Sequence, residues 1–369
     1  MRGRAAHWRY KTIVGAVATV LATLLALAAP PPHARASTQL QVYGAWLCGT
    51  DECTWASAPD MTTFDADNHW LIDRGDGTPS VNLVVLAFVN PLKLLDQTTD
   101  AGDVDGVPAG MTSAVVSYFT SHGIRVMLSV GGVTYTSDWD TALSQNPAQL
   151  GLDAAAVARQ LGVGIEIDYE NNTSPNLTGL QAFITAYRSQ ESYDATGSNP
   201  AARLTIDLAA GDQYLTVLDR YATQNWLMTS NPVLDYANAM VANKQLSVSK
   251  QEEQWQEHIS GEPRYAPPVP PLAPAKFTGS VYIAGTSQLT PECDNFSASL
   301  ESSTGTFVQD AAPAGAGTTQ GMLGYMFWAA GQPSVRGTTT FPPDTCQGGV
   351  GTGSSTYSIP VPMPALRQS

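Results

Sequence analysis

The chain has 369 residues, of which 32 are acidic and 18 are basic, so its formal net charge is −14. This balance excludes proteins that bind nucleic acid or anionic membranes through basic patches. The length suits one large domain or two small ones.

The first 36 residues are interpreted as an export signal. Four basic residues precede the apolar run 12–29, and three prolines and the small-residue site Ala34-Arg35-Ala36 follow it. That order is typical of a secretory signal peptide cleaved after Ala36. An uncleaved membrane anchor is the alternative, because the apolar run has roughly 18 residues. The five basic residues of the leader leave with it, so the net charge of −14 becomes −19 in the mature chain.

The chain has four cysteines, and an even number in an exported protein indicates two disulfides. Three pairings are open, and proximity in the sequence favours Cys48–Cys53 and Cys293–Cys346. None of the cysteines has a histidine at a zinc-binding spacing, so we expect no metal ion and no other cofactor. We also expect a monomer, with neither a nucleic acid nor a membrane as partner after cleavage of the signal.

Short apolar segments alternate with helical patterns along the mature chain. This alternation predicts parallel βαβ units, and eight of them predict closure into a (β/α)8 TIM barrel over residues 37–347. A doubly wound open sheet is the rival arrangement. Residues 348–369 are rich in Gly, Ser and Pro and are predicted to be a flexible tail. The predicted strands are 41–47, 81–89, 124–130, 163–169, 202–209, 232–240, 279–284 and 322–328.

Helical spacing fills several of the connections between these strands. Asn146 can cap a helix over 147–161, Pro147 suits its first position and Gly162 can end it. Residues 51–79 are polar and rich in Asp, Thr and Gly, which predicts a long loop after the first strand. The other predicted helices are 110–122, 177–189 and 248–258.

The segment 161–170, LGVGIEIDYE, is the most informative part of the sequence. Glu166, Asp168 and Glu170 alternate with apolar residues, so in a strand all three carboxylates share one face. In a barrel that face points inward, where three carboxylates must be hydrogen-bonded, protonated or functional. Two other interpretations stay open: a half-exposed antiparallel strand with its acids in water, and a carboxylate site for a divalent cation.

The close spacing of these acids affects how they ionise. Side chains on one face of a strand are about 6.5–7 Å apart, so the three carboxyl groups should titrate as a coupled set and retain protons near neutral pH. Glu170 comes last, at the carboxyl end of the strand, where TIM barrels carry their active sites. A protonated carboxyl group at that position can act as the general acid of glycoside hydrolysis.

At these residues the sequence resembles glycoside hydrolase family 18, the chitinase and endo-β-N-acetylglucosaminidase family. Residues 163–170 match the DGxDxDxE signature of its fourth strand, and Ser129-Val130-Gly131-Gly132 match its SxGG motif. Residues 324–328, GYMFW, resemble the final strand with its terminal tryptophan, and residues 81–88 resemble the second strand. The resemblance extends over residues 42–328.

The resemblance implies a role for each of the three acids. Glu170 would be the general acid and then the general base. Asp168 would orient the 2-acetamido group of the substrate, whose carbonyl oxygen attacks the anomeric carbon in place of an enzyme nucleophile. Glu166 would share a proton with Asp168.

Four further residues are implied as supporting the site. Ser129 and Tyr43 would support the acid network by hydrogen bonds, and Trp328 would form the floor under the sugar ring. On the sixth strand, Asn243 stands where the family has Asp or, in its plant-type members, Asn. The substrate implied is a polysaccharide or glycan that contains N-acetylglucosamine.

The sequence also departs from the family pattern. Val163 replaces the first Asp of the signature, Glu166 replaces the second, and Ala242 stands where the sixth strand should carry a Tyr that holds the acetamido group. Loss of one positioned donor can reduce a rate on the order of 100-fold. Because Asp168 and Glu170 are retained, a secreted chitinase-like hydrolase acting on β-1,4-linked N-acetylglucosamine is the leading hypothesis. The alternatives are an endo-β-N-acetylglucosaminidase for N-glycan cores and a non-catalytic chitin- or glycan-binding homologue.

Overall fold

The computed structural model describes most of the chain between residues 42 and 330, and all of the described residues belong to the compact unit 39–369. The predicted signal 1–36 and the predicted tail 348–369 lie outside the described residues, as do Cys293, Cys346 and Asn243. The described ranges are 42–50, 53–73, 77, 79, 81–171, 174–211, 217–240, 248–282, 304, 307–308, 310–312 and 321–330.

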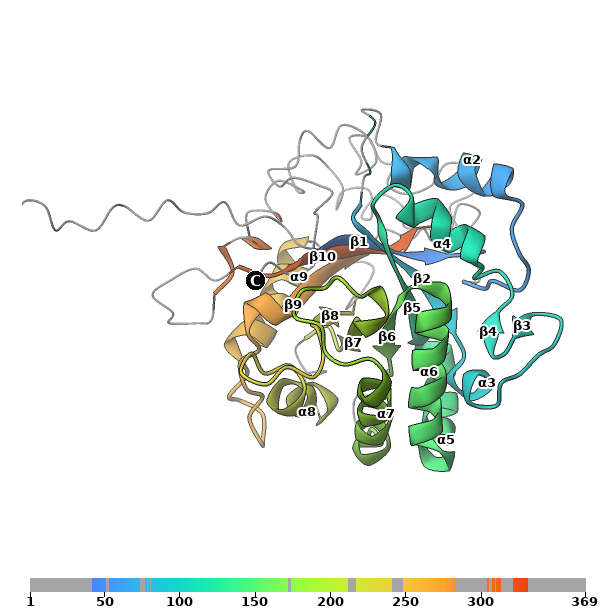
Figure 1. The fold of residues 1–369 in the computed structure, drawn as a ribbon. Coiled ribbons are helices and arrows are strands. Elements are labelled where there is room, and N and C mark those ends of the chain that lie inside the picture. Colours follow the sequence, from blue (N-terminus) through green and yellow to red (C-terminus); the bar gives the residue numbers. More distant parts are fainter. Residues whose placement is uncertain are drawn as a thin grey trace, which may run out of the picture. The chain divides into compact units, whose positions relative to one another are not determined.

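Eight parallel strands close into a barrel, which confirms the predicted TIM-barrel fold and excludes the open sheet (Figure 1). Their order around the barrel is β1-β10-β9-β8-β7-β6-β5-β2, so neighbours in the sequence are neighbours in the barrel. Each of the eight predicted strands overlaps one of them, although the predicted strand 232–240 is much longer than the observed one. The strands are β1 (Val42–Cys48), β2 (Leu83–Val89), β5 (Arg125–Gly131), β6 (Gly164–Asp168), β7 (Leu204–Leu208), β8 (Ala237–Ala239), β9 (Phe277–Tyr282) and β10 (Gly324–Ala330).

Side chains alternate between two packed layers, one inside the barrel and one between the barrel and its helices. On β6, Ile165 and Ile167 belong to the large outer cluster, whereas Glu166 and Asp168 face the interior. The interior apolar cluster is much smaller. The members of the interior apolar cluster are Val42, Trp46, Leu83, Val85, Met127, Tyr236 and Met326.

The helices cover the outside of the barrel, and Figure 1 shows α5, α6 and α7 lying alongside one another. The ends of α6 are as predicted: the side chain of Asn146 accepts a hydrogen bond from the Gln149 N–H, and Gly162 ends the helix with φ 69°. The helices are α2 (Met61–Ile72), α3 (Pro91–Leu95), α4 (Ser113–Thr120), α5 (Thr136–Gln145), α6 (Pro147–Leu161), α7 (Leu177–Gln190), α8 (Val217–Asn225) and α9 (Val248–Ser260).

The segment 51–79 is not only a loop, because α2 occupies Met61–Ile72 within it. Asp60 caps this helix by accepting hydrogen bonds from the N–H groups of Thr62 and Thr63. The polar composition hid the helix, since only one narrow side of it contacts the core: Phe64, Leu71 and Ile72 are buried. A small antiparallel hairpin, β3 (Asp103–Val104) and β4 (Val107–Pro108), was also not predicted.

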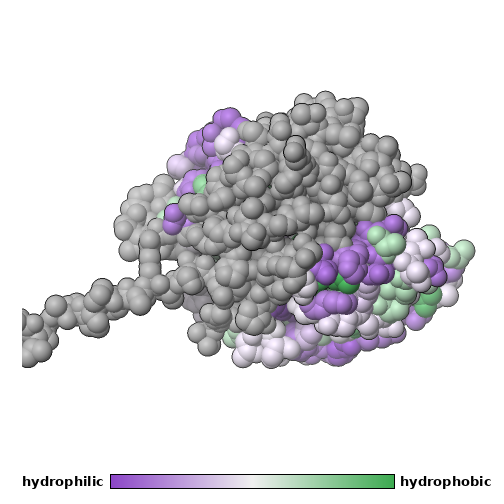
Figure 2. All heavy atoms as spheres, turned by 90° about the horizontal axis from the view of Figure 1, so that it is seen from above, coloured by the Kyte–Doolittle hydropathy of each residue, from purple (hydrophilic) through white to green (hydrophobic). Residues whose placement is uncertain are grey.

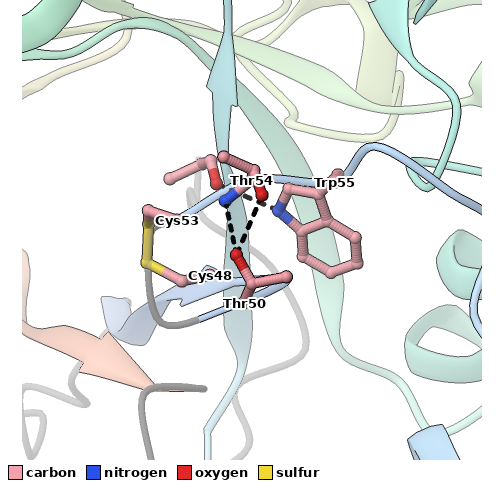
Figure 3. The surroundings of a disulfide bond; sticks show 6 residues. Cys48, Thr50, Cys53, Thr54 and Trp55 are labelled. Carbon is pink, nitrogen blue, oxygen red and sulfur yellow. Dashed lines mark hydrogen bonds between the residues drawn. A yellow bond between two sulfur atoms is a disulfide. The ribbon is translucent and has the colours of Figure 1, made fainter. Parts of the chain in front are cut away.

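A disulfide joins Cys48, at the end of β1, to Cys53, which confirms the first of the two predicted pairs (Figure 3). Hydrogen bonds also link Thr50 to Thr54 beside the disulfide. The Thr54 N–H donates to Thr50 Oγ1 at 3.2 Å, and the two threonine hydroxyls lie 2.9 Å apart. The indole of the next residue, Trp55, donates to the Ala87 carbonyl at 2.9 Å, which ties this segment to β2.

On the face drawn in Figure 2, the described residues are mainly hydrophilic, with small hydrophobic areas among them. Large exposed hydrophobic side chains are few in the described ranges: Val104, Val133 and Met228. None of the helices that the structure describes is long and apolar enough to cross a membrane.

Candidate active site

Glu166 and Asp168 on β6, and Glu170 just after it, lie toward the carboxyl end of the barrel. Glu166 is completely buried, Asp168 is 5% exposed, and Glu170, two residues beyond it, is half-buried. The structure thus excludes the interpretation of this segment as a half-exposed antiparallel strand with its acids in water, because β6 is buried and pairs in parallel with both neighbours. The gradient of exposure places Glu170 nearest to solvent, at the end where barrel enzymes bind their ligands.

Glu166 is surrounded by hydrogen-bond donors. Trp46 Nε1 donates to its Oε1 at 2.7 Å, and Asn238 Nδ2 donates to its Oε2 at 2.6 Å. Ser129 lies opposite Glu166 in the pairing of β5 with β6, but its hydroxyl has no hydrogen-bond partner among the described residues. Burial raises the pKa of Glu166 to about 7, because its effect is larger than the opposite effect of the hydrogen bonds from Trp46 and Asn238.

Asp168 has fewer hydrogen-bond partners than Glu166. Its Oδ1 is buried and has no hydrogen-bond partner among the described residues. Burial, followed by the charges of Glu170 and Glu166, raises the pKa of Asp168 well above its ordinary value. A neutral Asp168 with an unused oxygen beside a pocket is available to bind a polar group of a ligand.

The glycines of the Ser129–Gly132 motif allow the backbone to approach Asp168 closely. A Cβ on Gly131 would lie 1.9 Å from the Asp168 carbonyl oxygen, and the Gly132 N–H donates to that oxygen at 3.0 Å. Both glycines have positive φ values, 124° and 92°, which side chains disfavour. The motif therefore fixes the end of β6, which carries the acids, against the end of β5.

Glu170 lies at the mouth of this arrangement. The backbone N–H of Val133, just after the two glycines, donates a hydrogen bond to it and lowers its pKa. Burial outweighs this effect and raises the pKa of Glu170 to about 7. Near neutral pH Glu170 is thus divided between the acid and the carboxylate, as a group that both gives and takes a proton requires.

Aromatic rings form one wall of the pocket above the acids. Trp328, on β10, stacks on Phe88 with ring centroids 5.5 Å apart and an interplanar angle of 27°, and it meets the edge of Trp46 at 6.2 Å. The pocket has a volume of about 420 Å³, within the usual range for ligand sites. It is lined by Trp46, Cys53, Phe88, Val133, Thr134, Tyr135, Asp168, Glu170, Asp207, Met240 and Trp328.

Tyr43 does not lie in this site, so the prediction that it supports the acid network is wrong. Its ring contacts Tyr325 and Phe327 in the outer layer, with centroids 5.1 and 5.0 Å away. Period-two alternation puts Trp46, three residues later, on the inward face instead. The indole N–H of Trp46 supplies the hydrogen bond to Glu166 that was expected from Tyr43.

Two polar residues of the site were not predicted. Asp207 on β7 is buried and lines the pocket, and Asn238 on β8 lies opposite it in the strand pairing. Asn238 Nδ2 donates to Asp207 Oδ1 at 3.0 Å as well as to Glu166. The available signal was that Asp207 is the only acid in the predicted strand 202–209, on the same alternation as Thr205.

No group of His, Cys, Asp and Glu side chains within the described ranges has an arrangement that could hold a metal ion. The hydrogen bonds agree with this result for Glu166. Both of its oxygens already accept N–H donors, which a cation would have to displace.

No protein-family model matches the sequence, and no curated protein matches it. Solved structures with a distantly similar fold include a chitinase from Rhizomucor miehei, at 14% identity and a TM-score of 0.48, over 78% of this chain and 94% of that one. A glycoside hydrolase family 18 chitinase from Pseudoalteromonas aurantia has 15% identity and a TM-score of 0.46, over 78% and 93% of the two chains. A chitinase-like agglutinin from Robinia pseudoacacia has 14% identity and a TM-score of 0.41, over 68% and 88%. Such distant likeness concerns the fold alone.

Proposed function

We propose that this chain is an exported glycoside hydrolase that cleaves β-1,4-linked N-acetylglucosamine, with Glu170 as its general acid and base. The observation that carries the proposal is the inward row Glu166, Asp168 and Glu170, which ends in a half-buried acid beside an aromatic wall. Sugars present apolar C–H faces as well as hydroxyl groups, so Trp328 and Phe88 suit a pyranose ring. The supporting pKa of Glu170, raised to about 7, leaves a proton available near neutral pH.

The chemistry follows the substrate-assisted route. The carbonyl oxygen of the 2-acetamido group attacks the anomeric carbon, the glycosidic C–O bond breaks, and the leaving oxygen takes the proton of Glu170. Asp168, with its unused Oδ1, accepts the acetamido N–H and holds the group in line. Water then attacks the cyclic intermediate while Glu170 removes its proton, which restores the acid and gives net retention at the anomeric carbon.

The first test compares wild type with Glu170→Gln on tetra-N-acetylchitotetraose. Glutamine cannot transfer the proton, so kcat should fall on the order of 10³-fold. Glu253→Gln is the matched control, because Glu253 is exposed on α9 and pairs with Lys250. Its activity should equal that of wild type.

The pH profile and the product give two further readouts. Activity should be highest near pH 7, where Glu170 still carries a proton and Glu166 is still partly ionised. Proton NMR should show the β anomer first; a first product in the α form would contradict the substrate-assisted mechanism.

Two further assays distinguish chitin hydrolysis from cleavage of N-glycan cores and from binding without catalysis. Release of glycan from a high-mannose glycoprotein, without cleavage of the oligomer, would replace the chitin-type substrate with an N-glycan core. Retained binding of the oligomer without any product, in wild type as in Glu170→Gln, would make the chain a binding protein and overturn the proposal of catalysis.

A further inference from the structure

Asp207 is the one buried acid in the pocket that the proposed mechanism does not use. It is 2% exposed, comes from β7 rather than β6, and reaches both the pocket and the Glu166 carboxyl group. Two carboxyl groups in hydrogen-bond contact cannot both be ionised at low cost, so one of them must hold a proton.

The surrounding donors decide which of the two is the anion. Glu166 accepts N–H groups on both oxygens, from Trp46 at 2.7 Å and from Asn238 at 2.6 Å. Asp207 receives a longer N–H contact, 3.0 Å from Asn238. Charge-assisted hydrogen bonds stabilise the ionised form, so the better-supplied Glu166 is the anion and Asp207 the acid.

The orientation of the Asn238 amide is itself fixed. Its Oδ1 accepts a hydrogen bond from the Thr278 hydroxyl on β9, which leaves the Nδ2 hydrogens directed at Glu166 and Asp207. Neighbouring strands thus supply a polar chain from β9 through β8 to β7 and β6. The titratable groups that act on Asp207 are Glu166 and Asp168, both acidic, and Tyr236 is the next one on the side of β8.

We propose that Asp207 is a positioning residue that retains its proton and donates it in a hydrogen bond to Glu166, so that Glu166 carries the negative charge at the base of the site. Asp168 is then left neutral between that anion and Glu170. The anion lies below the pocket, behind Asp168, and its negative charge favours the positive charge that a substrate-assisted reaction develops on the cyclic intermediate. This role deepens the proposed hydrolase function and rests on it for its catalytic consequence, but the location of the proton can be tested without turnover.

Two substitutions distinguish the effect of the hydrogen bond that Asp207 donates from the effect of its side-chain volume. Asp207→Asn keeps an oxygen that accepts from Asn238 and an N–H that donates to Glu166, so it imitates the protonated acid. Asp207→Ala removes both groups, and Glu166 loses a donor that lowers its pKa. Asp153→Asn on α6 is the control, because burial also raises the pKa of Asp153 but that residue lies outside the barrel.

We expect kcat/KM of Asp207→Ala to fall on the order of tenfold, with the acidic limb of its pH profile displaced to higher pH. Asp207→Asn should lose less activity and keep the wild-type acidic limb, and Asp153→Asn should match wild type. Equal losses in both Asp207 variants with an unmoved acidic limb would reduce Asp207 to a structural residue and overturn the proposal.

Carboxyl ¹³C NMR of the full chain decides the location of the proton whether or not the chain is a hydrolase. Titration from about pH 4 to about pH 9 should show buried aspartates that titrate well above the ordinary value, and Asp207→Asn should lack one of these signals. If the signal lost in Asp207→Asn titrates at the ordinary value of an aspartate, the proposal is wrong. If the NMR result holds but the wild type has no activity, only the proposed function fails.

Discussion

The two ends of the barrel interior carry opposite charges and meet the cost of burial in opposite ways. At the carboxyl end, Glu166, Asp168 and Asp207 are buried together, and burial is the first cause that raises the pKa of each. At the amino end, Arg125 and Arg203 carry positive charge, and burial lowers the pKa of both, that of Arg125 to about 10.

The difference teaches how each end is used. A buried carboxyl group can become neutral by taking up a proton near neutral pH. A cluster of such acids can therefore give and accept protons in a reaction. A guanidinium stays charged, so it must find acceptors or reach solvent. Arg203 donates to the Gly197 carbonyl at 3.4 Å, whereas Arg125 Nη1 is buried without a partner among the described residues. We therefore expect catalysis at the acidic, carboxyl end and a contribution to stability alone at the basic, amino end.

The largest effect in this comparison is expected from Trp46→Phe. The substitution keeps an aromatic ring beside Trp328 but removes the N–H that donates to Glu166 at 2.7 Å. Loss of a donor to a buried charged group costs about 1.5–3 kcal/mol, so kcat/KM should fall at least tenfold. The pKa of Glu166 should rise, which moves the acidic limb of the pH profile to higher pH.

Trp226→Phe is the matched control for this prediction. The Trp226 indole donates at 2.8 Å to the neutral Gln181 side chain, away from the acids. That variant should lose stability without moving the pH profile. An unmoved acidic limb in Trp46→Phe would show that the indole N–H does not support the charge of Glu166.

From the sequence, the residues of the acidic end could be predicted only where one strand by itself shows which of its side chains face inward. In β6 the acids alternate with isoleucines, so the inward face can be read from the strand alone. In β1, VYGAWLC, both faces are apolar, so nothing in the strand distinguishes Tyr43 from Trp46, and the wrong one was chosen. Asp207 and Asn238 acquire their role through the register of β7 with β8, which no local pattern encodes. The barrel itself followed from eight apolar segments, because their spacing is a property of the whole chain.

The second-largest effect is expected in how the free energy of unfolding depends on pH. Asp207 has its pKa raised in the folded protein, so its contribution to stability is complete below the pKa of an unfolded aspartate, about 3.9, and is lost as pH rises through the folded value. Asp207→Asn removes this penalty. A tenfold difference in proton affinity between the folded and unfolded chain corresponds to about 1.4 kcal/mol. The advantage of the variant in the free energy of unfolding should therefore grow by at least that much between about pH 5 and about pH 9.

Denaturant unfolding of both proteins at several pH values measures this difference. Asp67→Asn, on the exposed side of α2, is the control and should show no growth with pH. A constant difference between Asp207→Asn and wild type over the whole range would mean that Asp207 is ionised in the fold, against the assignment of its proton.

The smallest effect is expected at the basic end, from Arg125→Met. Methionine has a similar length, fills the space of the side chain and removes a half-buried cation whose buried Nη1 has no partner in the described part of the chain. An unpartnered polar group held away from water carries a desolvation cost, so the free energy of unfolding should stay unchanged or rise by about 1–3 kcal/mol. Kinetic constants and pH profile should stay at wild-type values, since Arg125 opens β5 at the amino end, while the acids lie toward the carboxyl end. A change in the pH profile would instead mean that the arginines tune the acids through the barrel interior, and the two ends would then be one electrostatic unit.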